Sequence, residues 1–311
     1  MTPRLYLTFP LLAVLIWTGN NLVTKASAGA IPPSVIAFDR WFVAFVLLTP
    51  FCLRGAWARR ATIRQHLPQI VVLGLLGMAL YQGLAYYAAA STSATNIGIF
   101  VALVPLLTLA ISAVWLRQKH GPLALAGGLV SLAGILFVLG QGDYGRLLSH
   151  GVGRGDAFML GACVAYAAYG VCLKRWPLPL PVWTSLYAQV AAGLVFLLPG
   201  YLLAPAAPAT PATIAMIAYA GIPTSILAPV LWMQGVKHLG PGRTAIFMNL
   251  LPITTAVLAA LLLGEVLHPY HLVGGGLVVL GIVLAQRPAR PRPQPADRPA
   301  LRALIRRYRG E

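Results

Sequence analysis

Charge is what this sequence has least of. Only 9% of its 311 residues are charged, whereas 59% are hydrophobic. A water-soluble domain of this length does not stay solvated with so few charges. Cysteine is scarce too, and Cys52, Cys163 and Cys172 all fall in apolar stretches. They offer no disulfide framework and are expected to be small core residues.

The apolar residues gather into runs of about 20, each long enough to cross a hydrocarbon layer of ~30 Å. Ten such runs are expected to span the membrane: Leu5–Ala26, Ser34–Leu53, Leu67–Ala88, Ser91–Leu116, Pro122–Gly140, Asp156–Leu173, Val182–Leu203, Ile214–Val236, Ala245–Leu263 and Tyr270–Ala285. The first run is too long, and too polar near its end, to be a removed signal peptide. The sequence therefore predicts an all-α polytopic membrane protein with ten transmembrane helices.

The residues that give the net charge of +17 are concentrated on one side of the predicted membrane topology. Lys and Arg fall on alternate connections: Arg4, Arg54, Arg59, Arg60, Arg64, Arg117, Lys119, Lys174, Arg175, Lys237, Arg243 and the arginines after Ala285. Only Arg146 and Arg154 belong to the opposite set. Because positive loops stay in the cytoplasm, both termini are predicted there, in a bacterial-type inner membrane. The basicity thus indicates no nucleic-acid partner.

The chain is similar to itself. Residues 97–135 align with residues 244–282 at an offset of 147, and the stretch WTGNNLVTK at Trp17 aligns with YAAYGVCLK at Tyr166. Matched pairs include Ile99/Ile246, Phe100/Phe247, Pro105/Pro252, Thr108/Thr255, Gly127/Gly274, Gly128/Gly275 and Gly134/Gly281. Each copy therefore holds five predicted spans.

Five is an odd number, so the second copy is expected to enter the membrane inverted. The basic segment RQKHGP after span four has the counterpart GEVLHP after span nine, which carries Glu265 and neither Lys nor Arg. The predicted organisation is a first repeat at 1–141, a periplasmic connection at 142–155, an inverted repeat at 156–286 and a basic tail at 287–311. Inverted repeats are typical of alternating-access carriers, whose substrate binds near the midplane.

Polar side chains interrupt the spans at matching depths. Trp17, Asn20 or Asn21 and Thr24 form one stripe of a helix. A bare amide in lipid costs several kcal/mol, so such stripes should face other helices or water. The predicted substrate-binding set is Trp17, Asn20, Asn21, Asp39, Arg40, Tyr81, Gln82, Tyr86 and Asn96 in the first repeat, and Tyr166, Tyr169, Tyr187, Gln189, Trp232 and Asn249 in the second. Together they predict one wet path near the midplane.

Simpler roles stay open for these residues. Lys25 has the position of a side chain that snorkels to the headgroups, and Asp39 and Arg40 have the character of interhelical pairing groups. Asn and Gln join helices, while Tyr and Trp form interfacial belts. Four prolines, Pro105, Pro223, Pro229 and Pro252, are predicted hinges, with static bends as the alternative. The glycine-rich faces of spans five and ten are expected to allow close helix packing.

Three segments resemble a known family: PPSVIAFDRWFVAFVLLTPF at Pro32, PLLT at Pro105, and GPGRTAIFMNLLPITTAVLAALLLGEVL, which ends at Leu267. With the glycine-rich last span they are similar to the drug/metabolite transporter (DMT) superfamily, EamA type, over nearly the whole chain. The resemblance implies a ten-helix, five-plus-five inverted fold that exports amino acids or other small metabolites. The first copy has Leu-Arg-Gln where the second has Leu-Gly-Glu, so Glu265 is expected only to cap span ten.

Arg40, with Lys25 near the path, favours a substrate that carries a carboxylate. Tyr and Trp on the wall suit apolar or aromatic side chains and ammonium groups. The expected function is export of amino acids or similar zwitterionic or anionic small molecules. A proton-driven exporter of cationic drugs, which would depend on Asp39, and a passive channel are the alternatives, and the energy source stays open. A membrane-embedded enzyme is disfavoured because the cytoplasmic loops hold no acidic pair.

Two further segments have local patterns. Glu265, His268 and His271 recur at a spacing seen in metal sites, but an interfacial turn is the favoured interpretation; no metal and no cofactor are predicted. The tail ends in ALRALIRRYRGE, whose apolar residues recur at helical spacing among arginines. That pattern suits an amphipathic helix on anionic lipids of the inner leaflet, with disorder as the alternative.

Overall fold

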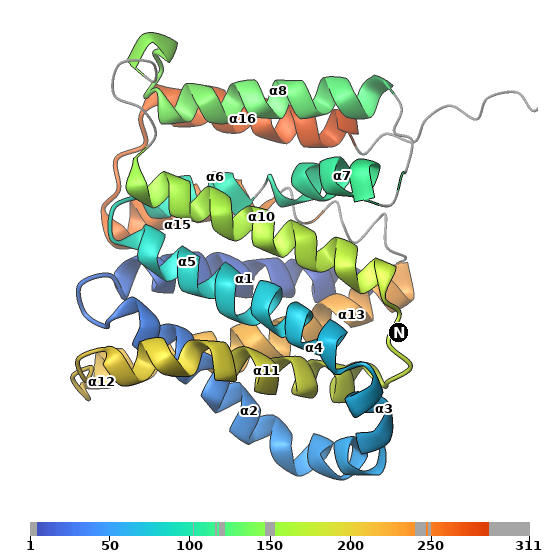
Figure 1. The fold of residues 1–311 in the computed structure, drawn as a ribbon. Helices are drawn as coiled ribbons and strands as arrows, with labels where there is room; N and C mark the ends of the chain where they lie inside the picture. The colour runs from blue at the N-terminus through green and yellow to red at the C-terminus, as the bar shows by residue number, and fades with distance from the viewer. Residues whose placement is uncertain are drawn as a thin grey trace, which may run out of the picture.

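The computed structural model describes residues 5–101, 103–115, 117, 122–146, 153–239, 247 and 250–285. In these ranges all regular structure is helical, and most helices run alongside one another (Figure 1). Six helical stretches are long and apolar enough to cross a membrane: Pro33–Ala58, Leu67–Ala89, Ala94–Trp115, Arg154–Arg175, Val182–Leu203 and Pro211–Trp232. Shorter apolar helices cover Leu125–Leu139, Leu250–Leu263 and Pro269–Gly281. The chain is a multi-pass helical membrane protein.

Every apolar run expected to span the membrane contains helix. The first part of the chain forms η1 (Leu5–Leu7), α1 (Thr8–Ala26), α2 (Pro33–Ala58), α3 (Arg60–Gln65), α4 (Leu67–Leu73), the π-helical η2 (Gly74–Leu80), α5 (Tyr81–Ala89), α6 (Ala94–Val101), α7 (Val104–Trp115) and α8 (Pro122–Leu139). The second part forms α10 (Arg154–Arg175), α11 (Val182–Leu203), α12 (Pro211–Tyr219), the π-helical η3 (Ala220–Leu227), α13 (Ala228–Leu239), α15 (Leu250–Leu263) and α16 (Pro269–Ala285).

Local sequence sets several helix ends. Pro33 occupies the first turn of α2, where its missing N–H has no intrahelical partner to lose. Thr210 and Thr213 form a capping box before α12. After α15, Gly264 adopts a φ of 67°, a left-handed conformation that glycine takes without steric cost. That turn reverses the chain and presents the next residue, Glu265, to another helix.

The predicted proline hinges lie where helix geometry changes. Span four is broken between α6 and α7, and Pro105 is the second residue of α7, where it has no N–H to donate to the preceding turn. Pro252 lies in the first turn of α15, Pro223 inside η3 and Pro229 at the start of α13. The structure therefore places a break or a change of helix type at Pro105, Pro223 and Pro229, while the motion of all four prolines stays a prediction.

The two π-helical segments pack in matching ways. A Cβ atom built on Gly74 of η2 would lie 2.6 Å from the carbonyl oxygen of Gln189 on α11. One built on Gly221 of η3 would lie 3.0 Å from the carbonyl oxygen of Arg40 on α2. Both glycines thus allow backbone-to-backbone contact with a helix from the other part of the chain. Gly74 and Gly221 are separated by the same 147 residues as the aligned stretches of sequence.

Helices α8 and α16 form a close pair at the top of Figure 1. The Ser131 hydroxyl donates to the Val278 carbonyl at 2.9 Å, a contact between residues 147 apart. A Cβ atom built on Gly134 would lie 2.6 Å from the Gly274 carbonyl oxygen, and one built on Gly274 would lie 2.7 Å from that of Gly134. The expectation that these glycine faces serve helix packing is confirmed.

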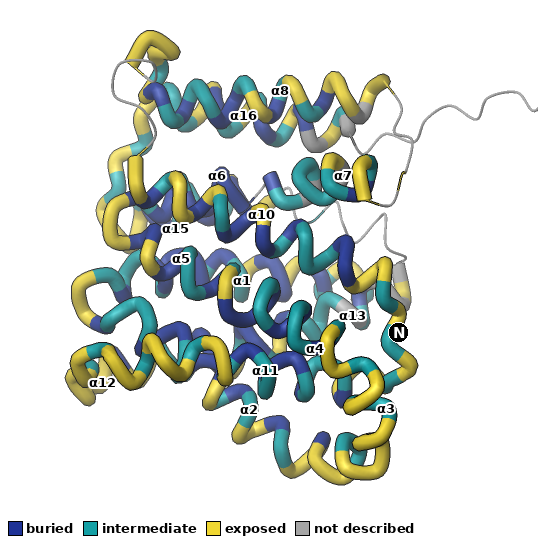
Figure 2. Tube along the Cα trace, in the orientation of Figure 1, coloured by how far each residue is buried: buried dark blue, intermediate teal, exposed yellow. Residues whose placement is uncertain are grey.

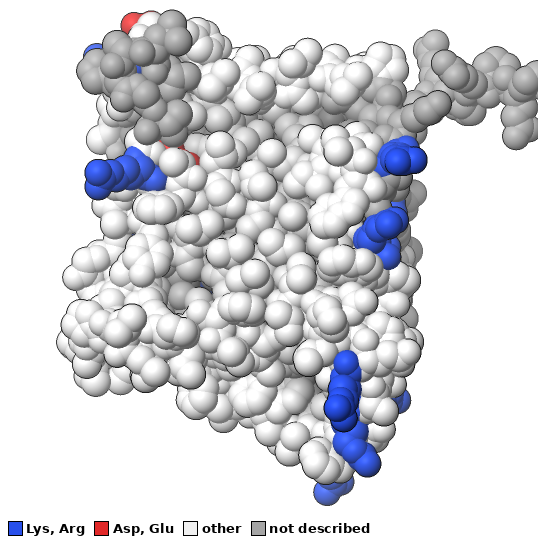
Figure 3. All heavy atoms as spheres, viewed as in Figure 1, with Lys and Arg blue, Asp and Glu red and all other residues white. Residues whose placement is uncertain are grey.

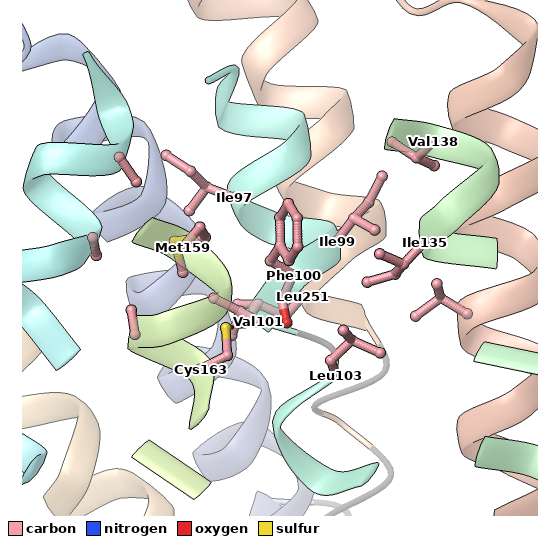
Figure 4. Packing of buried hydrophobic residues seen from close by; sticks show 14 of the residues in the cluster. Ile97, Ile99, Phe100, Val101, Leu103, Ile135, Val138, Met159, Cys163 and Leu251 are labelled. Carbon is pink, nitrogen blue, oxygen red and sulfur yellow. Dashed lines mark hydrogen bonds between the residues drawn. The ribbon is translucent and has the colours of Figure 1, made fainter. Parts of the chain in front are cut away.

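The largest group of buried apolar side chains surrounds α6. Ile99 and Phe100 lie among residues of α8, α10 and α15, including Ile135 and Met159 (Figure 4). All three cysteines are free and buried, as expected of small core residues.

Outside this core, exposed apolar positions run along the bundle (Figure 2). In Figure 3 the Lys and Arg side chains lie mainly along the edge near α3, with a smaller group at the opposite upper corner. The broad face between them is uncharged, as a lipid-facing surface requires.

Candidate functional site

Arg40 is the centre of a polar cluster inside the bundle. Its side chain is 1% exposed. Nη1 donates to Gln82 Oε1 at 2.7 Å, to Tyr86 Oη at 3.2 Å and to Asn20 Oδ1 at 3.3 Å. Nη2 donates to Ser225 Oγ at 2.9 Å. We call these five residues the Arg40 cluster.

Four helical segments build this cluster, and spacing explains part of it. Gln82 and Tyr86 are one turn apart on α5, so both side chains reach the same neighbour. Asn20 comes from the TGNN stretch of α1, which breaks an otherwise apolar helix. Ser225 comes from η3, far along the sequence. The sequence prediction brought four of the five together and missed Ser225.

The buried positive charge has no counter-ion among the residues that the structure describes. All described hydrogen-bond partners of Arg40 are neutral, and no carboxylate in the described ranges forms an ion pair with it. Arginine keeps its charge in proteins, and a buried charge without a partner is costly. In addition, its buried Nε has no hydrogen-bond acceptor in the described part of the chain. The site is therefore electrostatically suited to an anion.

A second polar group lies on α10, α11 and the start of α5. Tyr169 Oη donates to Gln189 Oε1 at 3.0 Å, and Gln189 Nε2 donates to Ser185 Oγ at 2.9 Å. The rings of Tyr81 and Tyr166 are 4.5 Å apart, and those of Tyr166 and Tyr169 are 5.7 Å apart. We call these five residues the tyrosine group. It offers aromatic surface and a buried amide but no charge.

Tyr81 connects the two groups. It precedes Gln82 on α5, and its ring centroid lies 4.5 Å from that of Tyr166. The aromatic stack therefore starts next to the charged cluster.

Several predicted site residues have other contacts. Trp17 and Trp232 contact each other with tilted rings, their centroids 5.4 Å apart, and pack against the core around α6. Asn21 donates from Nδ2 to Thr255 Oγ1 at 3.1 Å, which joins α1 to α15. That contact fits the helix-joining role left open for amides. Tyr187 lies between α2 and α11 and shares a hydrogen bond with Thr49, away from the Arg40 cluster.

The remaining predicted site residues are Asp39, Asn96 and Asn249. Asp39 is half-buried and follows Phe38 on α2, with no ion-pair partner in the described ranges. Asn96 lies in the first turn of α6, and its side-chain oxygen is buried without a hydrogen-bond partner among the described residues. Asn249 lies outside the described residues.

At the other end of α5 and α6, two charged side chains have structural roles. Lys25 donates from Nζ to the carbonyl oxygens of Ala89 and Thr92, at 2.9 and 2.7 Å. It therefore caps the end of α5 instead of extending to headgroups or to the path. Glu265 accepts from the N–H groups of Ala94 and Thr95, at 2.6 and 3.0 Å, and from the Thr95 hydroxyl. The expectation that it caps span ten is wrong, because it caps α6.

Two mostly apolar grooves lie apart from Arg40. One of about 320 Å³ is lined by residues of α6, α15 and α16, including Pro252 and Gly275. Another of about 440 Å³ lies between α4 and α11 and includes Tyr187. Neither groove is lined by a member of the Arg40 cluster, whose side chains are packed together.

The chain thus forms a bundle of apolar helices, and a guanidinium is buried among neutral polar groups inside it. This arrangement is that of a multi-pass membrane protein with an internal polar site. Two stretches of the chain, residues 4–140 and 153–286, match the model of the EamA-like transporter family. The chain belongs to this family, and it is a membrane transporter.

Relatives of similar length are named as transporters. The uncharacterized transporter YyaM of Bacillus subtilis (strain 168) is 25% identical, over 88% of this chain and 92% of its own. A "Probable terminal-alkyne amino-acid exporter" of Streptantibioticus cattleyicolor is 28% identical, over 94% of this chain and 96% of its own. A solved crystal structure aligns with a TM-score of 0.61 at 19% identity, over 91% of this chain and 97% of that one. That structure supports the fold alone.

Proposed function

We propose that this protein is a secondary transporter that exports amino acids or similar zwitterionic or anionic small metabolites. Transport proceeds by alternating access between two inverted five-helix repeats, 1–141 and 156–286, which together span the membrane ten times. Residues 142–155 connect the repeats on the periplasmic side of a bacterial-type inner membrane. Both termini are cytoplasmic, and the basic tail at 287–311 contacts anionic lipid.

The observation that carries the substrate class is the buried charge of Arg40. A guanidinium surrounded only by neutral acceptors is stabilised when a carboxylate binds, because charge-assisted bidentate hydrogen bonds replace weaker neutral ones. A cationic substrate would meet like charge at the same place. The neighbouring aromatic stack of Tyr81, Tyr166 and Tyr169 suits the apolar or aromatic side chain of an amino acid.

Matching contacts in the two parts of the chain support the inverted repeat. Gly74 packs on the Gln189 carbonyl as Gly221 packs on the Arg40 carbonyl, and each glycine begins or adjoins the start of a π-helical segment. The family model also matches the chain twice. In such a repeat the substrate site lies between the halves, and Arg40 contacts both of them.

The relative from Streptantibioticus cattleyicolor is named as an exporter of an amino acid. At 28% identity this name supports the substrate class and the outward direction for the present chain, without specifying a side chain.

Counterflow in proteoliposomes tests the proposal. Vesicles preloaded with L-leucine or L-phenylalanine should accumulate the labelled amino acid transiently and saturably, because a carrier exchanges substrate across the membrane. The amides of the same amino acids lack the carboxylate and should give no counterflow. Tags at the two ends of the chain should both be protected in right-side-out cells. Counterflow confined to organic cations, or non-saturable flux, would contradict the proposal.

A further inference from the structure

The hydrogen bonds of Arg40 are unevenly distributed over its guanidinium. Nη1 has three acceptors for its two hydrogens, whereas Nη2 has one acceptor, Ser225, for two. Nε is buried and has none in the described ranges. Nε–H and one N–H of Nη2 point the same way along one edge of a guanidinium, and this edge binds a carboxylate through two parallel hydrogen bonds. The underused edge of Arg40 is therefore the edge that a carboxylate requires.

Ser225 is held so that it can only accept a hydrogen bond from Nη2. Its hydroxyl donates to the Ala220 carbonyl at 2.8 Å, across the wide turn of η3, and accepts from Arg40 Nη2. Since the hydroxyl has a single hydrogen, its donor capacity is used within the helix. Ser225 thus presents a lone pair to Nη2, which is one of the two nitrogens that form the carboxylate-binding edge.

The partners on the two sides of the guanidinium belong to different parts of the chain. Nη1 is bound by α1 and α5, which lie in the first segment matched by the family model. Nη2 is bound by η3, which lies in the second. On α2 the next residue, Trp41, donates from Nε1 to the Met78 carbonyl of η2 at 3.0 Å. Met78 and Ser225 are 147 residues apart, so adjacent residues of α2 hold matching positions of the two π-helical segments.

We propose that a substrate carboxylate binds Nε and Nη2 of Arg40 side-on and displaces Ser225, so that anion binding releases η3 from α2. This inference rests on the proposed function and adds a positioning residue and a coupling step to it. In the empty site Ser225 takes the place of the anion and keeps the halves joined at Arg40. When the anion arrives, Arg40 stays bound to α1 and α5 through Nη1, while η3 loses its polar contact with the guanidinium.

The proposal predicts that Ser225 opposes binding. In Ser225→Ala the anion no longer competes with a hydroxyl for Nη2, so a carboxylate should bind about tenfold more tightly, because hydrogen bonds to charged groups contribute on that order. The coupling between anion binding and release of η3 should weaken at the same time, so the maximal rate of counterflow should fall. Ser225→Thr keeps a hydroxyl on Cβ and should restore the wild-type values.

The probes are propionate and propionamide, which have nearly the same shape and differ in charge. Binding is measured as the ligand-dependent rise in the melting temperature of the purified full-length protein. Thr224→Val is the matched control. Thr224 makes the same kind of bond inside η3, from its hydroxyl to the Tyr219 carbonyl at 3.1 Å, but does not contact Arg40. This variant should leave propionate binding unchanged.

The outcomes separate the two proposals. If wild-type protein is stabilised no better by propionate than by propionamide, or if Arg40→Gln binds propionate as wild type does, the proposed substrate class fails and this inference fails with it. If Arg40→Gln loses propionate binding but Ser225→Ala binds propionate equally or more weakly, only the displacement of Ser225 is overturned. Tighter binding by Thr224→Val as well would assign the effect to general loosening of η3, which also overturns it.

Discussion

The Asn20–Arg40 pair of the Arg40 cluster and the Tyr169–Gln189 pair of the tyrosine group hold matching positions in the two parts of the sequence, but only one pair is charged. Arg40 on α2 contacts Asn20 on α1, and Gln189 on α11 contacts Tyr169 on α10. Asn20 and Tyr169 are aligned when WTGNNLVTK is laid over YAAYGVCLK. One framework thus carries a guanidinium on one side and a neutral amide with stacked aromatic rings on the other.

Under the proposed function, this difference suits a small substrate with one charged and one apolar end. A charged end needs a charge-assisted partner, whereas an apolar end needs surface without a desolvation cost. Two charged clusters would repel each other in a low-dielectric interior. We infer that the second part of the chain keeps the packing of the first and has aromatic groups where the first has an anion site.

The largest effect is expected when Arg40 is replaced by a neutral amide like that of Gln189. Arg40→Gln should lower the catalytic efficiency of counterflow for an amino acid by about 100-fold, equal to ~2.7 kcal/mol, because the charge-assisted pair is lost. Thermal stability should not fall in proportion, since the variant no longer buries an uncompensated charge. Parallel counterflow and melting curves test both parts.

Arg40→Lys sharpens this result. Lysine keeps the charge but lacks the planar edge with two donors, so transport should be intermediate between wild type and Arg40→Gln. Equal transport by the three proteins would remove Arg40 from the mechanism. A collapse of stability in Arg40→Gln would mean that its hydrogen bonds, and not its charge, dominate.

Substitution of the two matched glycines tests whether the two π-helical segments pack equally closely on their neighbours. Gly74→Ala should destabilise the protein by about 1–3 kcal/mol, because the added methyl meets the backbone of α11. Gly221→Ala should cost somewhat less, since its distance to the Arg40 carbonyl is longer. Gly83→Ala is the control: its nearest neighbour is the end of Leu197, at 4.0 Å. If all three variants had the same melting temperature, the contacts of Gly74 and Gly221 with the neighbouring backbone would not be close.

Removing the neutral amide should have a smaller effect on function. Gln189→Ala breaks the hydrogen bonds with Tyr169 and Ser185 and should cost about 1–2 kcal/mol of stability. Propionate binding should change less than threefold, about 0.6 kcal/mol, because Arg40 is intact. A loss of propionate binding as large as that in Arg40→Gln would contradict the division of roles between the two groups.

The smallest effect is expected at the contact that joins the two parts of the chain at α6. Glu265→Gln removes the negative charge from the α6 cap but leaves an acceptor, so the melting temperature should fall by the equivalent of about 0.5–1 kcal/mol. Asp143→Asn is a suitable control, since its carboxylate binds only a local backbone N–H at Gly145 among the described contacts. An equal drop in both variants would contradict the capping role.

Much of the helical layout was predictable. Length and hydrophobicity placed helix in every expected apolar run, and the glycine-rich faces of spans five and ten predicted close helix packing, which α8 and α16 show with each other. These properties are local or periodic, so they can be predicted without knowledge of the tertiary contacts. The matched contacts of Gly74 and Gly221, which lie outside the aligned stretches, were found only in the structure.

The site was predictable only in part. The polar residues of α1, α2 and α5 stood out because amides and a guanidinium are rare in apolar helices. Ser225 did not, since serine is common in membrane helices; its position two residues after Pro223 was the available signal. Glu265 was assigned to the wrong helix because nothing local to the turn at Gly264 indicates that its carboxylate reaches α6.

The sequence by itself determined that this chain is a membrane protein, where its helices lie and which residues resist burial in lipid, because hydrophobic run length, charge and periodicity are properties of neighbouring residues. Only the tertiary structure decided which of those polar groups meet: Arg40 with Ser225 across 185 positions, and Glu265 with α6 across 171. Such contacts depend on how distant helices pack, and that packing is set by the sum of many small side-chain contacts that no single stretch of sequence contains.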